Sequence, residues 1–248
     1  MRSGLMLIAV TSLAALAYCQ GPALRPLKVP ASKTIKVAFV IDDGATMIDF
    51  AGPWEVFQDV MMKPDGKPIH SKEEQAQQDT IGPFELYTVA ISRTPIRTSG
   101  GMHVVPDYTF QDAPQPNIVV IPAQRGEQDE KIAWIKKVSE KTDITFSVCT
   151  GAAKLAKTGL LDGLEATSHH FFVPGFKQQY PTVKWRLDSR FIENDRVSTA
   201  GGLTSGIDLA LHVVERYYGR EIAQATADYM EYTGELWKNP AKASAQLH

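Results

Sequence analysis

The stretch "ITFSVCTGAAKLA", residues 144–156, contains the transition that decides the fold. Its first five residues are mostly apolar or β-branched, which is typical of a strand covered on both faces. Cys149 and Thr150 follow at once, and the small residues from Gly151 onward favour a helix. A strand that turns directly into a helix indicates an α/β protein, and it places the Cys149 sulfur above the end of its strand.

The same alternation of strand and helix patterns extends outward along the chain from residue 35. Further nearly continuous apolar runs predict strands at 35–41, 84–92 and 117–122. Helical patterns and their end signals predict helices at 53–62, 129–140, 150–159 and 205–219. This order predicts a three-layer α/β sandwich, with helices on both faces of a mostly parallel sheet.

Local signals mark the starts of two of these helices. Pro53 stands at the first helical position of its segment, where proline is favoured. In the last helix, Ser205 and Asp208 have the spacing of a capping box. The apolar residues of that helix are predicted to share one face that packs on the sheet: Ile207, Leu211, Val214 and Tyr218.

Two stretches interrupt the alternation of strands and helices. The segment 63–80 is polar and rich in Gln and Lys, so we expect it to be an exposed excursion. Within residues 96–106, the pair Gly100 and Gly101 predicts the turn of a β-hairpin.

Length and composition favour one globular domain without a nucleic-acid partner. The chain has 248 residues, of which 44% are hydrophobic, and its formal net charge is -2. This length supports a sizeable core, and the slight negative charge gives no attraction to nucleic acid. No His, Cys or Asp group has zinc-ligand spacing, and no glycine-rich phosphate motif is present, so neither a metal nor a cofactor is expected.

The N-terminus has the features of a secretory signal. Arg2 precedes an apolar run over residues 5–16, and the sequence "ALA" at 15–17 is a pattern that signal peptidases accept. The run of about 12 residues is shorter than the roughly 20 that span a bilayer, so stable membrane insertion is not expected. We therefore predict a signal peptide at residues 1–19 and a secreted or periplasmic protein.

The remainder of the chain divides into three predicted segments. Residues 20–33 contain three prolines and predict an extended tether, residues 34–236 form the domain, and residues 237–248 form a tail. A lipid anchor at Cys19 is not expected, because the bulky Tyr18 fits a lipoprotein cleavage site poorly.

Cys149 is one of two cysteines, and it has no plausible structural disulfide partner. One interpretation is that it is an inert, buried residue of the core. The other is that it is a nucleophile, because the free N–H groups and dipole of the following helix favour a thiolate and lower the thiol pKa. In that case the Thr150 amide donates to an anion formed when the sulfur attacks, and Gly151 relieves crowding at the turn.

Three segments together resemble the ThiJ/PfpI superfamily, which has the class I glutamine amidotransferase-like (flavodoxin-like) fold. They are "VIDDGATMIDFAGPWEVF" (40–57), "FSVCTGAAKLAKTGLLDGLEATSHH" (146–170) and "RVSTAGGLTSGIDLALHVVER" (196–216). The resemblance extends over residues 35–232. The forms "IDFAGPWEVF" and "CTGA" are most similar to the branch that contains isonitrile hydratases and the ligand-binding domains of some AraC-type regulators.

The resemblance implies a role for each of three residues. Cys149 matches the nucleophile, Thr150 lines the site with its backbone and hydroxyl, and Asp49 matches the carboxylate that approaches the cysteine. In a hydratase-like reaction the thiolate attacks the isonitrile carbon, Asp49 supplies a proton, and water releases an N-substituted formamide. A carboxyl group beside a thiolate in a partly desolvated cleft has a raised pKa and is able to donate a proton. The alternative for Asp49 is a turn or cap residue ahead of the Pro53 helix.

Gly151 and further positions are expected to line the substrate or oxyanion pocket. Relatives commonly have a Gly-Gly pair after the third strand, where this chain has Ala123 and Gln124, whose backbone amides remain available as donors. The resemblance also places a histidine near the nucleophile, and His169 is favoured over His170; an exposed or core histidine is the alternative. The segment 199–202 is expected to support the pocket by close packing.

The sequence leaves more than one function open. The first is an exported isonitrile hydratase-like enzyme that acts on a small molecule. The second is a non-catalytic small-molecule binding or sensing module, and the third is hydration or deglycation of reactive carbonyls, although relatives of that type usually have a glutamate where this chain has Asp49. Peptidase activity is not expected, because Thr150 stands where that branch has a histidine. The superfamily resemblance also implies a homodimer.

Overall fold

The computed structural model describes residues 24, 26–77 and 79–239 of the chain. The predicted signal peptide at 1–19, including Cys19, lies outside the described residues. Within the described part of the chain, no helix has both the length and the apolar composition that crossing a bilayer requires.

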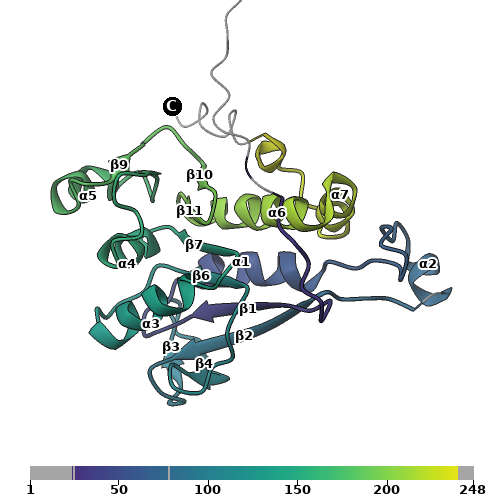
Figure 1. Cartoon of the computed structure of the whole chain (residues 1–248), viewed down its shortest axis with the longest axis horizontal. Helices are drawn as coiled ribbons and strands as arrows, with labels where there is room; N and C mark the ends of the chain where they lie inside the picture. Colours follow the sequence, from purple (N-terminus) through teal and green to yellow (C-terminus); the bar gives the residue numbers. More distant parts are fainter. Residues whose placement is uncertain (1–23, 25, 78, 240–248) are drawn as a thin grey trace, which may run out of the picture.

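The described residues form one central seven-stranded sheet, whose strands lie in the order β10-β11-β7-β6-β1-β2-β5 (Figure 1). The strands are β1 (Ile35–Val40), β2 (Phe84–Ala90), β5 (Tyr108–Thr109), β6 (Ile118–Ile121), β7 (Ile144–Val148), β10 (Phe191–Asn194) and β11 (Val197–Ala200). Neighbouring strands are parallel except for the β10-β11 pair. The predicted mostly parallel sheet is therefore confirmed, and its four predicted strands are β1, β2, β6 and β7.

Helices cover both faces of this sheet, as the predicted three-layer sandwich requires (Figure 1). The helices are α1 (Met47–Gln58), α2 (Lys72–Gln77), α3 (Asp129–Ser139), α4 (Gly151–Lys157), α5 (Val173–Gln179), α6 (Ser205–Tyr218) and α7 (Arg220–Tyr229), with a 3-10 turn η1 (Leu236–Lys238). Along β1, Val37 and Phe39 belong to the core shared with α1, α6 and α7, whereas Ala38 and Val40 belong to the core shared with α3 and α4. Each face of the strand therefore contributes to one of two buried layers.

Two short two-stranded sheets complete the fold. Strands β3 (Ile96–Arg97) and β4 (His103–Val104) are antiparallel, and Gly101 between them has a φ of 89°. The predicted hairpin within 96–106 is therefore confirmed. Strands β8 (Glu165–Ala166) and β9 (Lys184–Trp185) pair in parallel.

The predicted start of the first helix is wrong. Helix α1 begins at Met47, so that Pro53 lies inside it and Asp49 lies in its first turn. Tertiary packing outweighs the proline signal here, because the early turns bury Phe50 and bring Gly52 against α6. A Cβ at Gly52 would lie 2.9 Å from Ile207, so the glycine permits this close approach.

The predicted capping box at the start of α6 is also wrong. Thr204 is the N-cap residue, and within the described chain its side chain makes no capping bond. Asp208 is buried and binds Arg190 instead of a free amide of the helix. Of the predicted apolar face, Leu211 and Val214 are fully buried, whereas Ile207 and Tyr218 are half-buried and pack against the same core.

The predicted domain, residues 34–236, is too short at both ends. Leu27, in the predicted tether, is buried in the core, and its backbone N–H donates to the Arg216 carbonyl at 3.1 Å. Trp237, at the start of the predicted tail, is fully buried in the same core. The folded unit therefore includes Leu27 and Trp237, because burial of these two large apolar side chains stabilises the fold.

Candidate active site

Cys149 occupies a tight turn between β7 and α4, as predicted. Its φ of 57° lies in the left-handed region, which residues other than glycine rarely adopt. The Cys149 N–H donates to the Gly201 carbonyl at 2.8 Å, and the Ser168 hydroxyl donates to the Cys149 carbonyl at 2.7 Å. These contacts hold the unusual turn in place, and a strained backbone held this firmly is typical of functional sites.

Gly151 makes this turn possible, as predicted. A Cβ at this position would lie 2.1 Å from the carbonyl oxygen of Ile121, which is closer than any real contact. The start of α4 therefore packs directly against the end of β6, and only glycine fits there.

Asp49 is completely buried beside the cysteine. Its Oδ2 accepts a hydrogen bond from the Ala123 amide at 3.1 Å. Among the described residues, its Oδ1 has no hydrogen-bond partner, while the carboxyl group as a whole interacts with the Cys149 thiol and the Leu203 amide. Burial raises the pKa of Asp49 to about 7, so the carboxyl group is able to hold or release a proton near neutral pH.

The Cys149 thiol does not have the lowered pKa expected from the sequence. The side chain is a free thiol, and the residue is only 7% exposed. Burial, followed by the negative charge of Asp49, raises the thiol pKa to about 12, although the Thr150 and Leu203 amides act in the opposite direction. The amides at the start of α4 are therefore outweighed, because desolvation and a neighbouring carboxylate both oppose a thiolate.

The two groups titrate as a pair, and the pair carries one negative charge above about pH 7. When the proton is on the sulfur, the charge is on Asp49. When the proton moves to Asp49, the sulfur becomes a thiolate and its neighbour is neutral, so the repulsion that raised the thiol pKa disappears. The arrangement therefore couples formation of a nucleophile to formation of an acid.

Two predicted pocket residues, Ala123 and Gln124, make contacts within the protein. The Ala123 amide binds Asp49, so it positions the acid instead of donating to a substrate oxyanion. The Gln124 side chain donates to the Val40 carbonyl at 2.9 Å and thus fixes the loop after β6.

Thr150 and His169 both lie near the turn. Thr150 is the N-cap residue of α4, and its amide faces the sulfur. The ring of His169 packs against Gly202, where a Cβ would lie 2.4 Å from it, and stacks on His170 with ring centroids 4.6 Å apart. Burial lowers the pKa of His169, and its Nδ1 accepts a hydrogen bond from the Phe171 amide. Its observed contacts therefore indicate a packing role.

Leu203 is the site residue that the sequence did not reveal. Its backbone has a φ of 57°, and its amide faces both Cys149 and Asp49. The apolar side chain gave no chemical signal, because the interacting group belongs to the backbone. The preceding pair Gly201 and Gly202 was a local indication of an unusual loop, but it did not identify the donor.

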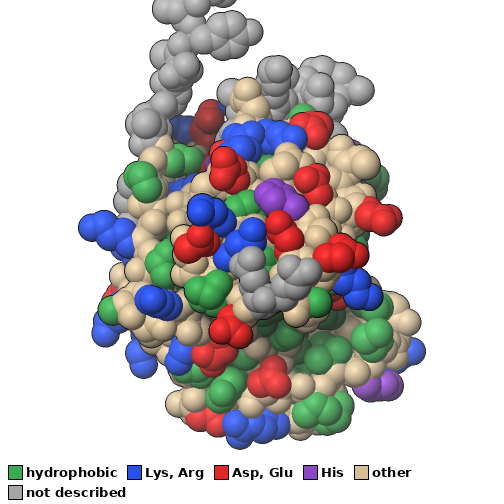
Figure 2. All heavy atoms as spheres, turned by 90° about the vertical axis from the view of Figure 1, so that its right-hand side faces the viewer, with side chains coloured by type: hydrophobic (Ala, Val, Ile, Leu, Met, Phe, Trp, Pro, Cys, Tyr) green, Lys and Arg blue, Asp and Glu red, His purple; other side chains and the backbone are tan. Residues whose placement is uncertain are grey.

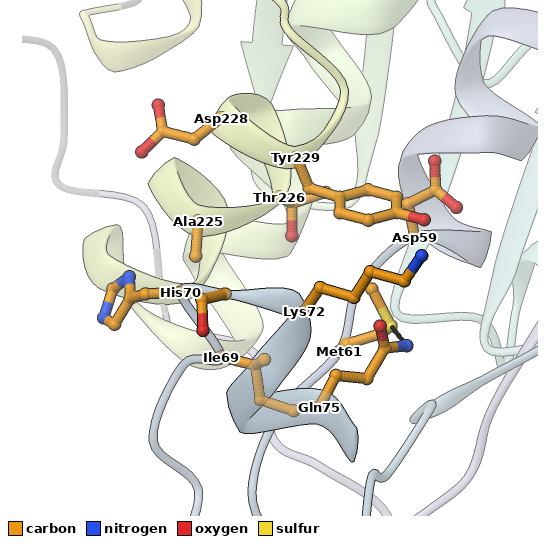
Figure 3. A pocket seen from close by; sticks show the side chains of 11 residues that line it. Asp59, Met61, Ile69, His70, Lys72, Gln75, Ala225, Thr226, Asp228 and Tyr229 are labelled. Carbon is orange, nitrogen blue, oxygen red and sulfur yellow. Dashed lines mark hydrogen bonds between the residues drawn. The ribbon is translucent and has the colours of Figure 1, made fainter. Parts of the chain in front are cut away.

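Two cavities lie away from Cys149 and Asp49. The chain after α1, residues 69–75 around the start of α2, and α7 form a cavity of about 380 Å³ whose lining includes Asp59, Lys72 and Tyr229 (Figure 3). Neither Cys149 nor Asp49 lines it. The face that carries α2 and α7 mixes acidic and basic side chains without one dominant sign (Figure 2). We assign this face no part in the cysteine chemistry.

A doubly covered parallel sheet with a cysteine at a strand-to-helix turn, and a buried carboxyl beside the thiol, defines a class of α/β proteins with a potential cysteine nucleophile. Comparison with known proteins gives the particular family. The DJ-1/PfpI family pattern matches residues 35–216, and the chain belongs to this family.

Relatives within this family differ in activity. Isonitrile hydratase from Pseudomonas putida is 28% identical over 174 residues, which cover 64% of this chain and 75% of the relative. The HTH-type transcriptional regulator GbdR from Pseudomonas aeruginosa is 26% identical over 153 residues, covering 60% of this chain and 41% of the regulator. Because one relative is an enzyme and the other a regulator, family membership alone does not determine the activity.

A solved structure supports the fold assignment. The crystal structure of a THiJ/PfpI family protein from Pseudomonas syringae superposes with a TM-score of 0.67 at 22% sequence identity. The match covers 82% of this chain and 76% of that chain. The flavodoxin-like fold expected from the sequence is therefore confirmed.

Proposed function

We propose that the protein is a cysteine-dependent enzyme that adds water to an isonitrile and releases an N-substituted formamide. The observation that carries this proposal is the contact between the Asp49 carboxyl, with a pKa of about 7, and the Cys149 thiol on its tight turn. The similarity to isonitrile hydratase supports the choice of substrate class.

In the first step, the thiol proton moves to Asp49 and the Cys149 thiolate attacks the isonitrile carbon. A carbon–sulfur bond forms, and the former isonitrile carbon gains negative charge. Asp49 then returns its proton to that carbon, which leaves a neutral thioimidate and an Asp49 carboxylate. The Oδ1 atom, which has no partner in the described chain, is the oxygen available for this transfer.

In the second step, Asp49 accepts a proton from water as the water oxygen attacks the thioimidate carbon, and the nitrogen takes up that proton. The carbon–sulfur bond then breaks, and its electron pair returns to sulfur. The hydroxyl group then loses its proton as the formamide carbonyl forms. This proton returns to the Asp49–Cys149 pair. The sum is one isonitrile plus one water giving one N-substituted formamide.

The direct test is turnover of an alkyl isonitrile, with formamide detected by NMR or mass spectrometry. Wild type should form formamide, and Cys149→Ala should form none. Asp49→Asn should be slower by about 10²- to 10⁴-fold, which is the usual contribution of a general acid or base. Formamide production by Cys149→Ala at the wild-type rate would contradict the assigned nucleophile.

A parallel assay distinguishes the carbonyl alternative. Methylglyoxal should be consumed no faster by wild type than by Cys149→Ala, because Asp49 is shorter than the glutamate that usually accompanies that chemistry. Faster Cys149-dependent consumption of methylglyoxal than of the isonitrile would favour the carbonyl reaction.

A binding module is the second candidate, and the buried thiol favours it. Cys149 is 7% exposed and its pKa is raised, which is also compatible with an inert residue in a ligand pocket. The similarity to GbdR supports this alternative. Thermal stabilisation by a small molecule that persists in Cys149→Ala, without any turnover, would favour binding over catalysis.

A further inference from the structure

The loop between β11 and α6 lies against the Cys149 turn, since the Gly201 carbonyl accepts a hydrogen bond from the Cys149 N–H, and it presents the Leu203 amide to Cys149 and Asp49. Leu203 has a φ of 57°, a conformation that residues with side chains adopt rarely. Its side chain is 44% exposed, so burial of the leucine does not explain the conformation. A strained residue persists only where its neighbours fix the backbone, and the flanking contacts identify what fixes this one.

On one side of Leu203, Gly201 links two backbone segments. Its N–H donates to the Arg190 carbonyl at 2.8 Å, and its own carbonyl accepts from the Cys149 N–H at 2.8 Å. The backbone of Arg190 is therefore joined through a single residue to the backbone of the nucleophile.

On the other side of Leu203, Thr204 binds the side chain of the same arginine. The Arg190 Nη2 atom donates to the Thr204 hydroxyl at 2.9 Å. Thr204 precedes α6, but in the described structure its side chain does not cap the helix. The bond to Arg190 is thus the contact through which the hydroxyl acts.

Arg190 is itself held by a buried carboxylate. Its Nε donates to Oδ2 of Asp208, which is almost fully buried in the first turn of α6, and Oδ1 of Asp208 accepts from the Tyr232 hydroxyl at 3.0 Å. A planar guanidinium is able to bind Asp208 and Thr204 at once, whereas an ammonium group is a single point charge. Arg190 therefore connects the helix to both flanks of Leu203.

We propose that Arg190 is a positioning residue of the active site, which holds the Leu203 amide against Cys149 and Asp49 through Gly201 and Thr204. Arg190 acts through the loop and does not touch the substrate. This inference rests on the proposed cysteine chemistry, because its purpose is to keep a hydrogen-bond donor facing the group that becomes anionic.

The test is the pH dependence of Cys149 alkylation by iodoacetamide in the full chain, with modification at Cys149 quantified by mass spectrometry. Thr204→Val removes the hydroxyl and keeps the shape, so the Leu203 donor should drift from the sulfur. The midpoint should rise by about 0.5 to 1 pH unit, and alkylation at pH 7.5 should slow by about three- to tenfold. Thr204→Ser keeps the hydroxyl and should retain the wild-type profile.

Arg190→Lys provides a second variant. It keeps the positive charge beside Asp208 but loses the planar guanidinium that binds Asp208 and Thr204 at once. It should shift the profile in the same direction as Thr204→Val, and the double variant should shift it no further than the larger single effect, because both changes break one connection. The matched control is Thr182→Val, which removes a hydroxyl bonded to Asp162 at 2.6 Å outside the loop. It should leave the profile unchanged.

The outcomes separate this inference from a general loss of stability. Urea midpoints measured on every variant show whether it is folded at the assay pH. Thr204→Val that is folded and has the same profile as Thr182→Val would overturn the proposal, as would a shift in Thr204→Val that Arg190→Lys does not share. Alkylation needs no isonitrile, so failure of formamide formation would count against the proposed function and leave this test intact.

Discussion

The Asp49 carboxyl and the Cys149 thiol lie against each other in the interior, and between them they hold one titrating proton near neutral pH. The two residues come from different halves of the fold, one from the first turn of α1 and the other from the turn after β7. Because each group affects the ionisation of the other, changing either one should alter stability and reactivity in ways that depend on pH.

Replacing Asp49 by Asn should stabilise the protein at high pH. The folded-state pKa of Asp49, about 7, lies above the ordinary value of 3.8. Between these two values the folded chain binds more protons than the unfolded chain, so wild-type stability falls as the pH rises through this window. The free energy of unfolding of wild type falls by at most about 4 kcal/mol above pH 7. Asp49→Asn has no ionisable group at this position, so its stability does not show this fall.

Urea unfolding at pH 4, 6 and 8 measures this effect. The stability of Asp49→Asn relative to wild type should increase steadily with pH. Asp79→Asn, which changes an exposed carboxylate in the 63–80 segment, is the control and should show no such trend. A difference that stays constant over this range would show that burial does not shift the ionisation of Asp49.

Adding one methyl group at Gly151 should be strongly destabilising. The new Cβ would overlap the Ile121 carbonyl, whose backbone is fixed in β6, so neither partner is able to move cheaply. Gly151→Ala should cost more than about 3 kcal/mol, beyond ordinary overpacking. Gly175→Ala is the control, because nothing lies within 4 Å of that position in α5, and it should be neutral or stabilising. Equal urea midpoints for both variants would contradict the close packing of α4 on β6.

Truncating Trp237 should show that the folded unit extends beyond residue 236. Its ring is fully buried and lies 5.2 Å from the Arg220 guanidinium. Trp237→Ala should cost about 3–5 kcal/mol in urea unfolding, as is typical of large aromatic truncations in a core. Tyr229→Ala, at a side chain that is 59% exposed, should cost less than about 1 kcal/mol. If the two variants lost the same small amount, Trp237 would not belong to the core.

The buried strands could be predicted from the sequence because each is a continuous apolar run. This signal located β1, β2, β6 and β7, which form the centre of the sheet. Strand β5 has only two residues, and β10 and β11 mix polar with apolar residues, so none of the three is a continuous apolar run. The early start of α1 was missed for another reason, since its packing against α6 outweighs the local preference of Pro53.

The site was predictable where it depends on side chains and local turns. The sequence pattern of a strand followed by Cys149 and Gly151 predicted the tight turn. The family resemblance identified Asp49. The prediction of a lowered thiol pKa was wrong. Distant segments bury the sulfur, and such burial cannot be seen in a local sequence pattern. Leu203 was missed and Ala123 was given a different role, because both act through backbone amides whose direction depends on loop geometry.

The most direct measurement of the central claim is the pH dependence of Cys149 alkylation in wild type and in Asp49→Asn, with Cys149→Ala used to subtract reaction at Cys19. In wild type, the rate should begin to rise with an apparent pKa near 7, because ionisation of the pair creates the state from which the thiolate forms. In Asp49→Asn the shared proton is lost and the thiol must ionise directly, which burial opposes, so the rise near pH 7 should be absent. Identical profiles for the two proteins would contradict a proton shared between Asp49 and Cys149.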